Sequence, residues 1–297
     1  MANDNNLEQL IQEYQLTKEE HSSISRKISE IFFKGKTKPK IPTAIFTIGP
    51  PGSGKTGLNG LAQKELNGNL VIVNNDELRP FHPKAEEIAK KHPKEYIKIT
   101  NEESKYWTDE LVDKTIEEGY NILYEGTGRK IEIFKRMIEK MLQRGYIIII
   151  KAMAVNELNC LMSIVERYAG QVQHKGWGRI VSIKTFYKSY DAEMIETIDT
   201  LENEGEISEV EVYIRSDEPT NPIKIYSTSQ KQYKDAKTAI IKGRKLDKIN
   251  AIKYYEQYFK RSKLKDKETE EILERMEEIH KHHKTIDDMD YNRKKLK

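Results

Sequence analysis

The octapeptide GPPGSGKT, residues 49–56, constrains this chain more than any other stretch. It fits the P-loop spacing G-x-x-x-x-G-K-[ST] at every fixed position. The apolar run 43–48 before it predicts a buried strand, and apolar residues at helical spacing follow it from Leu58. Glycines let the backbone approach phosphate oxygens, so that N–H groups and a helix N-terminus face negative charge. The stretch therefore predicts a site for a nucleoside triphosphate.

The P-loop chemistry assigns roles to single residues. Lys55 is expected to reach the β- and γ-phosphates of ATP, and the Thr56 hydroxyl to ligate Mg²⁺. The alternative is an incidental Gly-rich turn between a strand and a helix. The residues expected to bind ATP are Gly49, Pro50, Pro51, Gly52, Ser53, Gly54, Lys55 and Thr56.

Composition narrows the class of protein. A chain of 297 residues is long enough for one large α/β domain with an appendage, or for two small domains. Its residues are 37% hydrophobic and 33% charged. No run approaches the roughly 18 apolar residues of a membrane span, and the polar start MANDNNLEQL lacks a signal-peptide core, which predicts a cytoplasmic protein with no membrane partner. The single cysteine, Cys160, excludes an internal disulfide and a cysteine-based zinc site. Its helical surroundings predict a buried thiol.

Charge is unevenly distributed along the chain. The net charge is +3, but residues 228–297 hold 20 Lys and Arg against 13 Asp and Glu. The preceding residues hold 31 basic groups against 35 acidic ones. The body is therefore not expected to bind nucleic acid, whereas for the basic tail that question stays open.

Hydrophobic periodicity predicts alternating strands and helices after an N-terminal helical segment. Residues 7–33 favour one or two helices on the outside of the core. Such alternation is typical of an α/β protein with a mostly parallel sheet covered by helices on both faces, here a P-loop kinase fold. The expected strands are 43–48, 70–73, 120–124 and 146–155, and the expected helices are 103–118, 130–143 and 156–169.

The rest of the chain is less regular. Residues 170–181 predict a mobile Gly-rich loop, 181–201 one long helix, and 210–214 with 223–226 a pair of short strands. From 228 onward we expect an α-helical C-terminal extension whose last twenty residues are disordered. The predicted units are a helical segment 1–40, a kinase domain 41–227 and a basic helical tail 228–297.

Two carboxylates follow predicted strands. Because ligands bind at the carboxyl ends of parallel strands, the P-loop, Asp76, Glu125 and Arg129 should share one edge of the sheet. Asp76 suits a base for an attacking hydroxyl, or it is a helix N-cap. Glu125 opens the turn EGTGR, where it would hold Mg²⁺ through water or bind a substrate hydroxyl, or serve only the turn.

Several cationic residues complete the candidate set. Arg129 would grip a substrate phosphate or is an ordinary surface arginine. Arg167 and Arg179 are separated by the Gly-rich segment, as expected of a lid that neutralises charge in the transition state, although for either arginine alone a solvent-exposed position is favoured. The cluster of His280, His282 and His283 favours a solvated basic face over a metal site.

The assembled motifs resemble the zeta toxin family of bacterial toxin–antitoxin modules, P-loop kinases that phosphorylate UDP-N-acetylglucosamine. GTPase motifs such as N-K-x-D are absent from the sequence. The resemblance rests on GPPGSGKT, VIVNNDELRPFHP, YNILYEGTGR, and AMAV followed by ERYAG, in the family's order across about residues 42–215. The basic tail after 228 departs from the family pattern.

The resemblance implies a role for each matching position. Lys55 and Thr56 would bind ATP and Mg²⁺, and Asp76 would activate the 3′-hydroxyl of the amino sugar. Arg167 matches the family's ATP-facing arginine and Arg179 its lid arginine. Asp109 stands where the family has a substrate-contacting glutamate. The residues expected to line the sugar-nucleotide pocket are Glu125, Thr127 and Arg129.

The family resemblance also implies a toxic function and a partner. A 3′-phosphate on UDP-N-acetylglucosamine would block peptidoglycan synthesis, and family members are inhibited by a small helical antitoxin that covers the nucleotide site. Two alternatives stay open on the residues alone. One is a P-loop kinase acting on another small-molecule or polynucleotide hydroxyl, and the other is a non-catalytic, nucleotide-dependent binding module.

Overall fold

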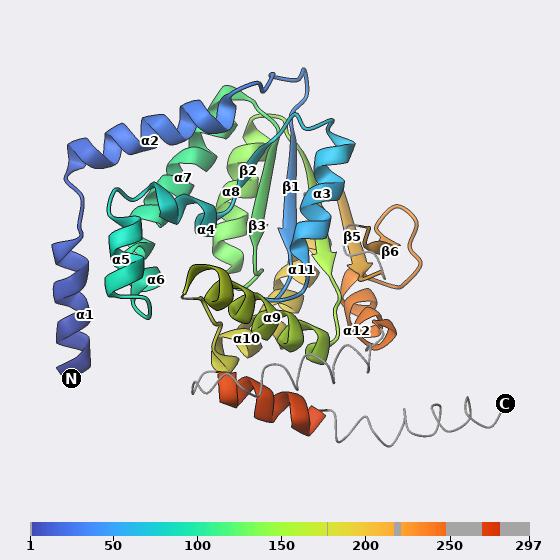
Figure 1. Cartoon of the computed structure of the whole chain (residues 1–297). Helices are drawn as coiled ribbons and strands as arrows, with labels where there is room; N and C mark the ends of the chain where they lie inside the picture. The colour runs from blue at the N-terminus through green and yellow to red at the C-terminus, as the bar shows by residue number, and fades with distance from the viewer. Residues whose placement is uncertain (1, 177, 217–220, 248–268, 280–297) are drawn as a thin grey trace.

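A six-stranded sheet with the strand order β2-β3-β1-β4-β5-β6 forms the centre of the computed structural model (Figure 1). The structure describes residues 2–176, 178–216, 221–247 and 269–279. Neighbouring strands from β2 to β5 run parallel, and β6 pairs antiparallel with β5. This confirms the predicted α/β fold with a mostly parallel sheet. The strands are β1 Thr43–Ile48, β2 Val71–Val73, β3 Ile122–Gly126, β4 Ile147–Met153, β5 Glu209–Ile214 and β6 Ile223–Ser227.

Helices precede the sheet, connect its strands and follow it. The first half of the chain contains α1 Ala2–Glu13, α2 Lys18–Phe33, α3 Lys55–Glu65, α4 Asn75–Leu78, the 3₁₀ turn Arg79–Phe81, α5 Ala85–Lys91, α6 Tyr96–Ile99 and α7 Asn101–Glu118. The second half contains α8 Ile131–Gln143, α9 Glu157–Lys175, α10 Ile183–Tyr190, α11 Glu193–Glu204, α12 Ala236–Leu246 and a helix at 269–279. None of the helices in these described stretches combines the length and apolarity that crossing a membrane needs.

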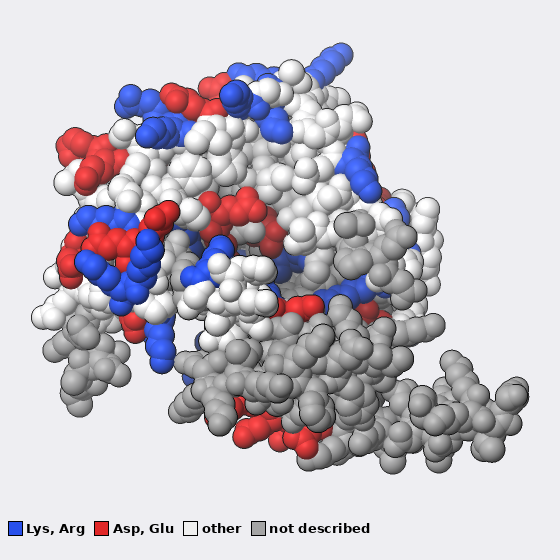
Figure 2. Space-filling view, viewed as in Figure 1, with Lys and Arg blue, Asp and Glu red and all other residues white. Residues whose placement is uncertain are grey.

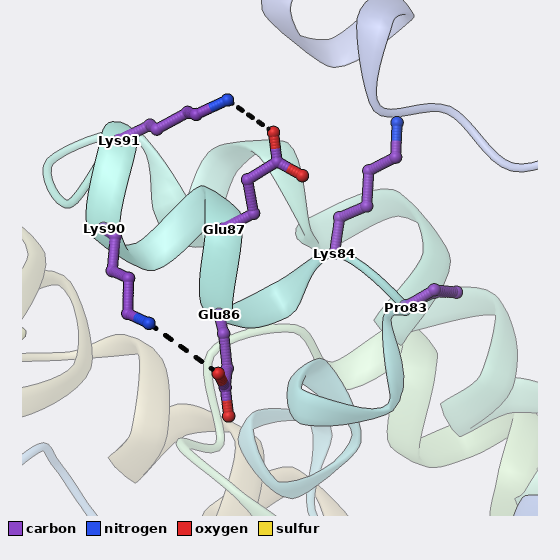
Figure 3. Close-up of a pocket in the computed structure, with 6 residues that line it drawn as sticks. All are labelled: Pro83, Lys84, Glu86, Glu87, Lys90 and Lys91. Atoms are coloured by element: carbon purple, nitrogen blue, oxygen red, sulfur yellow. Dashed lines mark hydrogen bonds and ion pairs between the residues drawn. The ribbon is translucent and has the colours of Figure 1, made fainter.

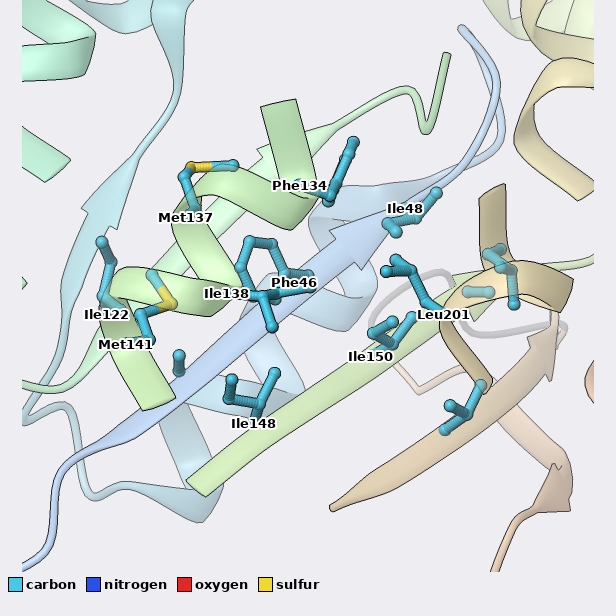
Figure 4. Close-up of a cluster of buried hydrophobic side chains, with 14 of the residues drawn as sticks. Phe46, Ile48, Ile122, Phe134, Met137, Ile138, Met141, Ile148, Ile150 and Leu201 are labelled. Carbon is cyan, nitrogen blue, oxygen red and sulfur yellow. The ribbon is translucent and has the colours of Figure 1, made fainter. Parts of the chain in front are cut away.

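The core lies on both faces of the sheet because successive side chains of a strand alternate. Phe46 and Ile48 of β1 are fully buried in the larger cluster, to which α8 contributes Phe134 and Met141, and the Phe134 ring lies 5.6 Å from that of Phe46 (Figure 4). Ile45, which immediately precedes Phe46, belongs to a second cluster on the opposite face, together with residues of α3 and β3. Helices on both faces thus hold the carboxyl ends of β1 and β3 in register.

Two predictions between β4 and β5 were wrong. Helix α9 continues through residues 170–175, which had been expected to form a loop, and it ends at Gly176 with a φ of 75°. A glycine is the usual residue for such a left-handed C-terminal position, whereas Gly170 is tolerated inside the helix. The single helix expected at 181–201 is two helices, α10 and α11. They separate because Phe186 packs with α9 in one cluster, while Met194 and Ile198 pack in the main core.

The N-terminal helices were predicted correctly as elements packed outside the sheet. Helix α2 starts with a capping box between Thr17 and Glu20 and packs on α7. Helices α5 and α6 were not predicted, because each is short and its apolar residues show little periodicity. The disorder expected for the last twenty residues falls almost entirely outside the described residues, as do the three C-terminal histidines.

Candidate active site

The P-loop connects β1 to α3, as its sequence predicts. Gly52 and Gly54 adopt φ angles of 76° and 86°, which favour glycine. A side-chain carbon at Gly52 would lie 2.2 Å from the carbonyl oxygen of Cys160, so the loop lies directly against α9. The hydroxyl of Ser53 is buried and has no hydrogen-bond partner within the described chain. An unpaired polar group beside a helix N-terminus fits a loop that accommodates phosphate oxygens.

Lys55 connects the loop to Glu125. Its ammonium group donates to the carbonyl oxygen of Gly49 at 3.0 Å and lies 4.0 Å from Oε1 of Glu125. Burial lowers the pKa of Lys55, and the Glu125 charge opposes that effect. Glu125 is one of the last residues of β3 and not, as predicted, the first residue of a turn beyond it. The P-loop and the EGTGR stretch also meet through a hydrogen bond from the Gly49 N–H to the Gly126 carbonyl at 3.4 Å.

Asn59 belongs to the same group, although the sequence did not identify it. Its amide donates to Oε2 of Glu125 at 2.7 Å, and its amide oxygen accepts from the hydroxyl of Thr47 at 2.9 Å. Thr47 is fully buried, so this chain of hydrogen bonds fixes the orientation of Glu125. The only signal was position, because Asn59 lies four residues after Lys55 and therefore on the same face of α3.

Asp76 lies in α4, just beyond the carboxyl end of β2. The helix N-cap is Asn74, whose side chain accepts from the Asp76 N–H at 2.9 Å, so the capping alternative for Asp76 was wrong. The Asp76 carboxylate forms ion pairs with Arg79, at 3.1 Å, and with Arg179. Burial raises the pKa of Asp76, but Arg179 and Arg79 outweigh this effect and hold the pKa below its ordinary value. The carboxylate is therefore ionised at neutral pH.

Arg79 is a second residue that the sequence did not identify. Its side chain is buried, and besides Asp76 it donates to the Ile97 carbonyl at 3.0 Å, to Thr100 at 3.3 Å and to Asn101 at 3.1 Å. With four acceptors, the guanidinium has one orientation and holds the carboxylate in place. Its position three residues after Asp76 was the available signal.

The two predicted lid arginines approach the same carboxylates. Arg167 is on α9, and Arg179 follows that helix and pairs with Asp76. Burial and the Arg179 charge lower the pKa of Arg167, whereas Asp76 and Glu125 raise it. Figure 2 shows acidic and basic side chains facing each other across a hollow, in the region where α4 and α9 lie in Figure 1. The structure thus brings together Lys55, Asp76, Glu125, Arg167 and Arg179.

The other predicted substrate residues have different partners. Arg129 pairs with Glu193 of α11 at 3.2 Å, and Asp109 of α7 pairs with Arg136 of α8 at 3.5 Å. Thr127 is half-buried in the stretch between β3 and α8. Their roles stay predictions.

The oxygen donors at the P-loop fit Mg²⁺. Thr56 is the second residue of α3 and is exposed, and the Glu125 carboxylate is the acidic group beside Lys55. Within the described residues, no cluster of three or more His, Cys, Asp or Glu side chains could hold a metal. A cation here would therefore take most of its ligands from phosphate and water, as Mg²⁺ commonly does.

A depression of about 440 Å³ on α5 lies apart from these groups (Figure 3). Lys91 pairs with Glu87 at 2.7 Å, and Lys90 pairs with Glu86 at 3.9 Å. None of the predicted site residues lines it. Because these charges are exposed and paired along one helix, we interpret the depression as a solvated surface.

The fold and the site define a P-loop protein of the kinase type, with a phosphate loop between β1 and α3 and opposed carboxylates and arginines at the carboxyl edge of the sheet. The family model "Zeta toxin" matches residues 29–231. This chain therefore belongs to the zeta toxin family.

Relatives and solved structures agree with this assignment. The chain is 27% identical to Toxin zeta of Streptococcus pyogenes over 199 residues, which are 67% of this chain and 68% of that protein. It is 31% identical to Toxin PezT of Streptococcus pneumoniae serotype 4 over 135 residues, 46% of this chain and 53% of that one.

A structure from the PezAT chromosomal toxin–antitoxin system of S. pneumoniae superimposes with a TM-score of 0.69 at 20% identity, covering 89% of this chain and 98% of the other. The AvrRxo1-ORF1:-ORF2 complex with ATP reaches 0.51 at 14% identity, covering 76% and 71%. At these identities the two structures are evidence for the fold alone.

Proposed function

We propose that this protein is an ATP-dependent kinase that phosphorylates the 3′-hydroxyl of the amino sugar in UDP-N-acetylglucosamine and thereby acts as a bacterial toxin. Membership of the zeta toxin family supports the toxin class. The observation that carries the proposal is the ionised Asp76 carboxylate, which two arginines hold close to Lys55 and Glu125 of the phosphate loop region.

The proposed reaction uses the groups that this chain positions. The P-loop N–H groups bind the phosphates of ATP, and Lys55 moves from the Gly49 carbonyl to their oxygens. Arg179 exchanges the Asp76 carboxylate for phosphate oxygens, so that Asp76 can accept the proton of the attacking sugar hydroxyl. Arg167 adds positive charge over the transferring group. Mg²⁺, held by Thr56 and through water by Glu125, would neutralise charge on the phosphates.

The proposed acceptor lies towards the stretch after β3. We propose that Glu125, Thr127 and Arg129 contact the sugar nucleotide and that Asp109 adds a further contact. Arg129, now paired with Glu193, would exchange that carboxylate for the diphosphate. The 3′-oxygen must next accept an enolpyruvyl group on the way to peptidoglycan. A phosphate on it would therefore stop wall synthesis.

We further propose a small helical antitoxin as the partner. The solved relative from the PezAT system comes from a toxin–antitoxin pair, and AvrRxo1-ORF1 was solved together with ORF2. An antitoxin over the nucleotide site would keep the kinase silent in the cytoplasm, where its proposed substrate is made. The division into segment 1–40, kinase domain 41–227 and basic tail 228–297 belongs to the same proposal.

The test is a phosphorylation assay with ATP, Mg²⁺ and a panel of UDP-sugars, read by product mass. We expect one phosphate on UDP-N-acetylglucosamine. Asp76→Asn should lower turnover by about 100-fold to 10,000-fold while ATP binding persists, because it removes the base and leaves the P-loop intact.

Asp113→Asn is the matched control, since Asp113 is an exposed carboxylate that pairs with Lys140. Phosphorylation of a polynucleotide end in place of the sugar would overturn the substrate assignment. If expression of Asp76→Asn is as toxic to bacteria as expression of the wild type, this would favour the non-catalytic binding module over the kinase.

A further inference from the structure

Arg215 directly follows β5, and its guanidinium group forms hydrogen bonds with both the phosphate loop and α9. One guanidinium nitrogen donates to the carbonyl oxygen of Gly52 and, at 3.0 Å, to the hydroxyl of Ser163. Nε donates to the Ser53 carbonyl at 3.4 Å, and the remaining nitrogen to the Asn159 carbonyl at 3.3 Å. One side chain therefore joins two peptide groups of the P-loop to two residues of α9.

We propose that Arg215 is a positioning residue for nucleotide binding, an inference that rests on the proposed function for the identity of the nucleotide. In a planar trans peptide the C=O and the following N–H point in opposite directions. Holding the Ser53 carbonyl therefore turns the N–H of Gly54 to the opposite side of the loop from Arg215. Holding the Gly52 carbonyl fixes the Ser53 N–H, which closes the loop on the Pro50 carbonyl at 3.1 Å.

The same side chain sets the distance between the P-loop and Arg167. Ser163, which Arg215 contacts, lies one helical turn before Arg167 on α9. Gly52 is already in contact with the Cys160 carbonyl of that helix, so the two elements meet without a gap. The hydrogen bonds of Arg215 stabilise this contact between the P-loop and α9, and they thereby fix the position of Arg167 relative to the loop.

Only arginine can do this with one side chain. Its planar fork carries five N–H donors, and the four acceptors here belong to both elements. A carbon added at Gly54 would lie 3.6 Å from Nε, so the guanidinium lies beside the loop backbone. Its charge is thus next to the segment that faces the phosphates.

The experiment compares Arg215→Lys and Arg215→Gln with the wild type for binding of ATP with Mg²⁺, without any sugar. The control is Arg244→Lys, since Arg244 of α12 also donates to a carbonyl, that of Tyr190 at 2.6 Å, and stacks on the same tyrosine without contacting the P-loop. We expect the Kd for ATP to rise roughly 10-fold to 100-fold in Arg215→Gln, the size of losing charged hydrogen bonds. The Kd of Arg215→Lys should lie between those of the wild type and Arg215→Gln, and Arg244→Lys should bind ATP as tightly as the wild type does.

Two further measurements distinguish a role of Arg215 in positioning the P-loop from a role in the stability of the fold alone. The rise in Tm on adding ATP should shrink in both Arg215 variants and persist in Arg244→Lys, even if all three lose Tm without ligand. In the kinase assay Arg215→Lys should raise KM for ATP and leave KM for the sugar unchanged.

ATP affinity within twofold of wild type in Arg215→Lys and Arg215→Gln would overturn the inference and leave the proposed function standing. If Arg215→Gln does not fold, Arg215→Lys decides. A wild type that binds no ATP would overturn both. A lower kcat with both KM values unchanged would mean that Arg215 does not position the loop for nucleotide binding, and this also counts against the inference.

Discussion

At the scale of single residues, Asp76 has two arginines of different kinds. Arg79 is buried and bonded to three other groups, so it holds the carboxylate in place. The side chain of Arg179 is 32% exposed, and it forms an ion pair with the Asp76 carboxylate. The first arginine is a fixed support, and we interpret the second as an exchangeable partner that leaves when substrate arrives.

Arg79→Met should move the acid limb of the kcat/KM pH profile to higher pH. The pKa of Asp76 is raised by burial and lowered more strongly by Arg179 and Arg79, so removing one cation raises it. Misplacement of the carboxylate should also cost about 10-fold to 100-fold in kcat/KM at neutral pH. The measurement is kcat/KM with the proposed acceptor UDP-N-acetylglucosamine from about pH 3 to pH 8, because the ordinary pKa of an aspartate lies near the acid end of that range and the Asp76 pKa lies lower still.

Arg79→Lys keeps the charge and should shift the limb less than Arg79→Met does, although both disturb the same contacts. Arg144→Met, at an exposed arginine that donates to the Glu117 carbonyl, is the control. An acid limb that stays in place in Arg79→Met would mean that Arg79 does not set the Asp76 pKa.

The sequence supplied the residues that define the site, and missed the ones that support it. Lys55, Asp76 and Glu125 were predictable because each lies at or just beyond the carboxyl end of a strand of a recognisable βαβ pattern. Asn59 and Arg79 were not, because their importance comes from contacts with residues such as Glu125 and Asn101 that only the folded chain brings near. Neighbours across the fold cannot be deduced from local spacing.

At the scale of elements, a buried lysine links the P-loop helix to the sheet. Lys151 of β4 is 1% exposed and pairs with Glu65 near the end of α3, at 2.9 Å, and with Glu211 of β5. Lys224 of β6 also reaches Glu211, at 2.7 Å. Three strands and α3 therefore share one charge cluster.

Lys151→Met should lower the free energy of unfolding by about 2 to 4 kcal/mol, because it leaves Glu211 buried with only Lys224 as its cation. The double variant Lys151→Met with Glu211→Leu should recover much of that loss, since an apolar pair of similar volume avoids an unpaired charge. Urea unfolding of the two variants measures both values. A double variant less stable than Lys151→Met would contradict this expectation, because it would mean that Lys224 and Tyr213 compensate the buried Glu211 without Lys151.

Strands were easier to predict than the helices after β4. Apolar runs such as 146–155, which only Lys151 interrupts, predict buried strands directly. The end of α9 was missed because Gly170 resembles a helix stop, although the stop is Gly176. The break between α10 and α11 depends on which core each helix enters, a property of tertiary packing.

At the scale of the whole molecule, helices at both ends of the chain pack on the central α/β unit. His21 of α2 is stacked on Trp107 of α7 with ring centroids 5.6 Å apart, and it contacts Glu103 and Glu110 of the same helix. The helix at 269–279 packs on α9 and α10, where Arg275 pairs with Glu157 at 3.1 Å. The expected helical extension is thus present in the residues described, while the proposed domain boundaries stay predictions.

Docking of α2 should depend on pH through His21. Burial lowers the pKa of His21, but Glu103 and Glu110 outweigh it and raise the pKa above its ordinary value of 6.5. This pairing therefore stabilises the fold fully below that value and is lost as the pH rises through the raised pKa. We expect His21→Gln to lose about 0.5 to 1 kcal/mol of unfolding free energy at pH 6 and less at pH 9.

Denaturation followed by Trp107 fluorescence in a Trp177→Phe background measures this difference. His92→Gln, at a histidine on the edge of Tyr14, is the control. A His21→Gln loss that grows from pH 6 to pH 9 would contradict the assigned sign.

The contact between Gly52 and the Cys160 carbonyl leaves no room for even a methyl group. Any side chain at position 52 would have to push the phosphate loop away from the helix that carries Arg167. The absence of a side chain there is therefore what permits the two halves of the site to sit so near each other.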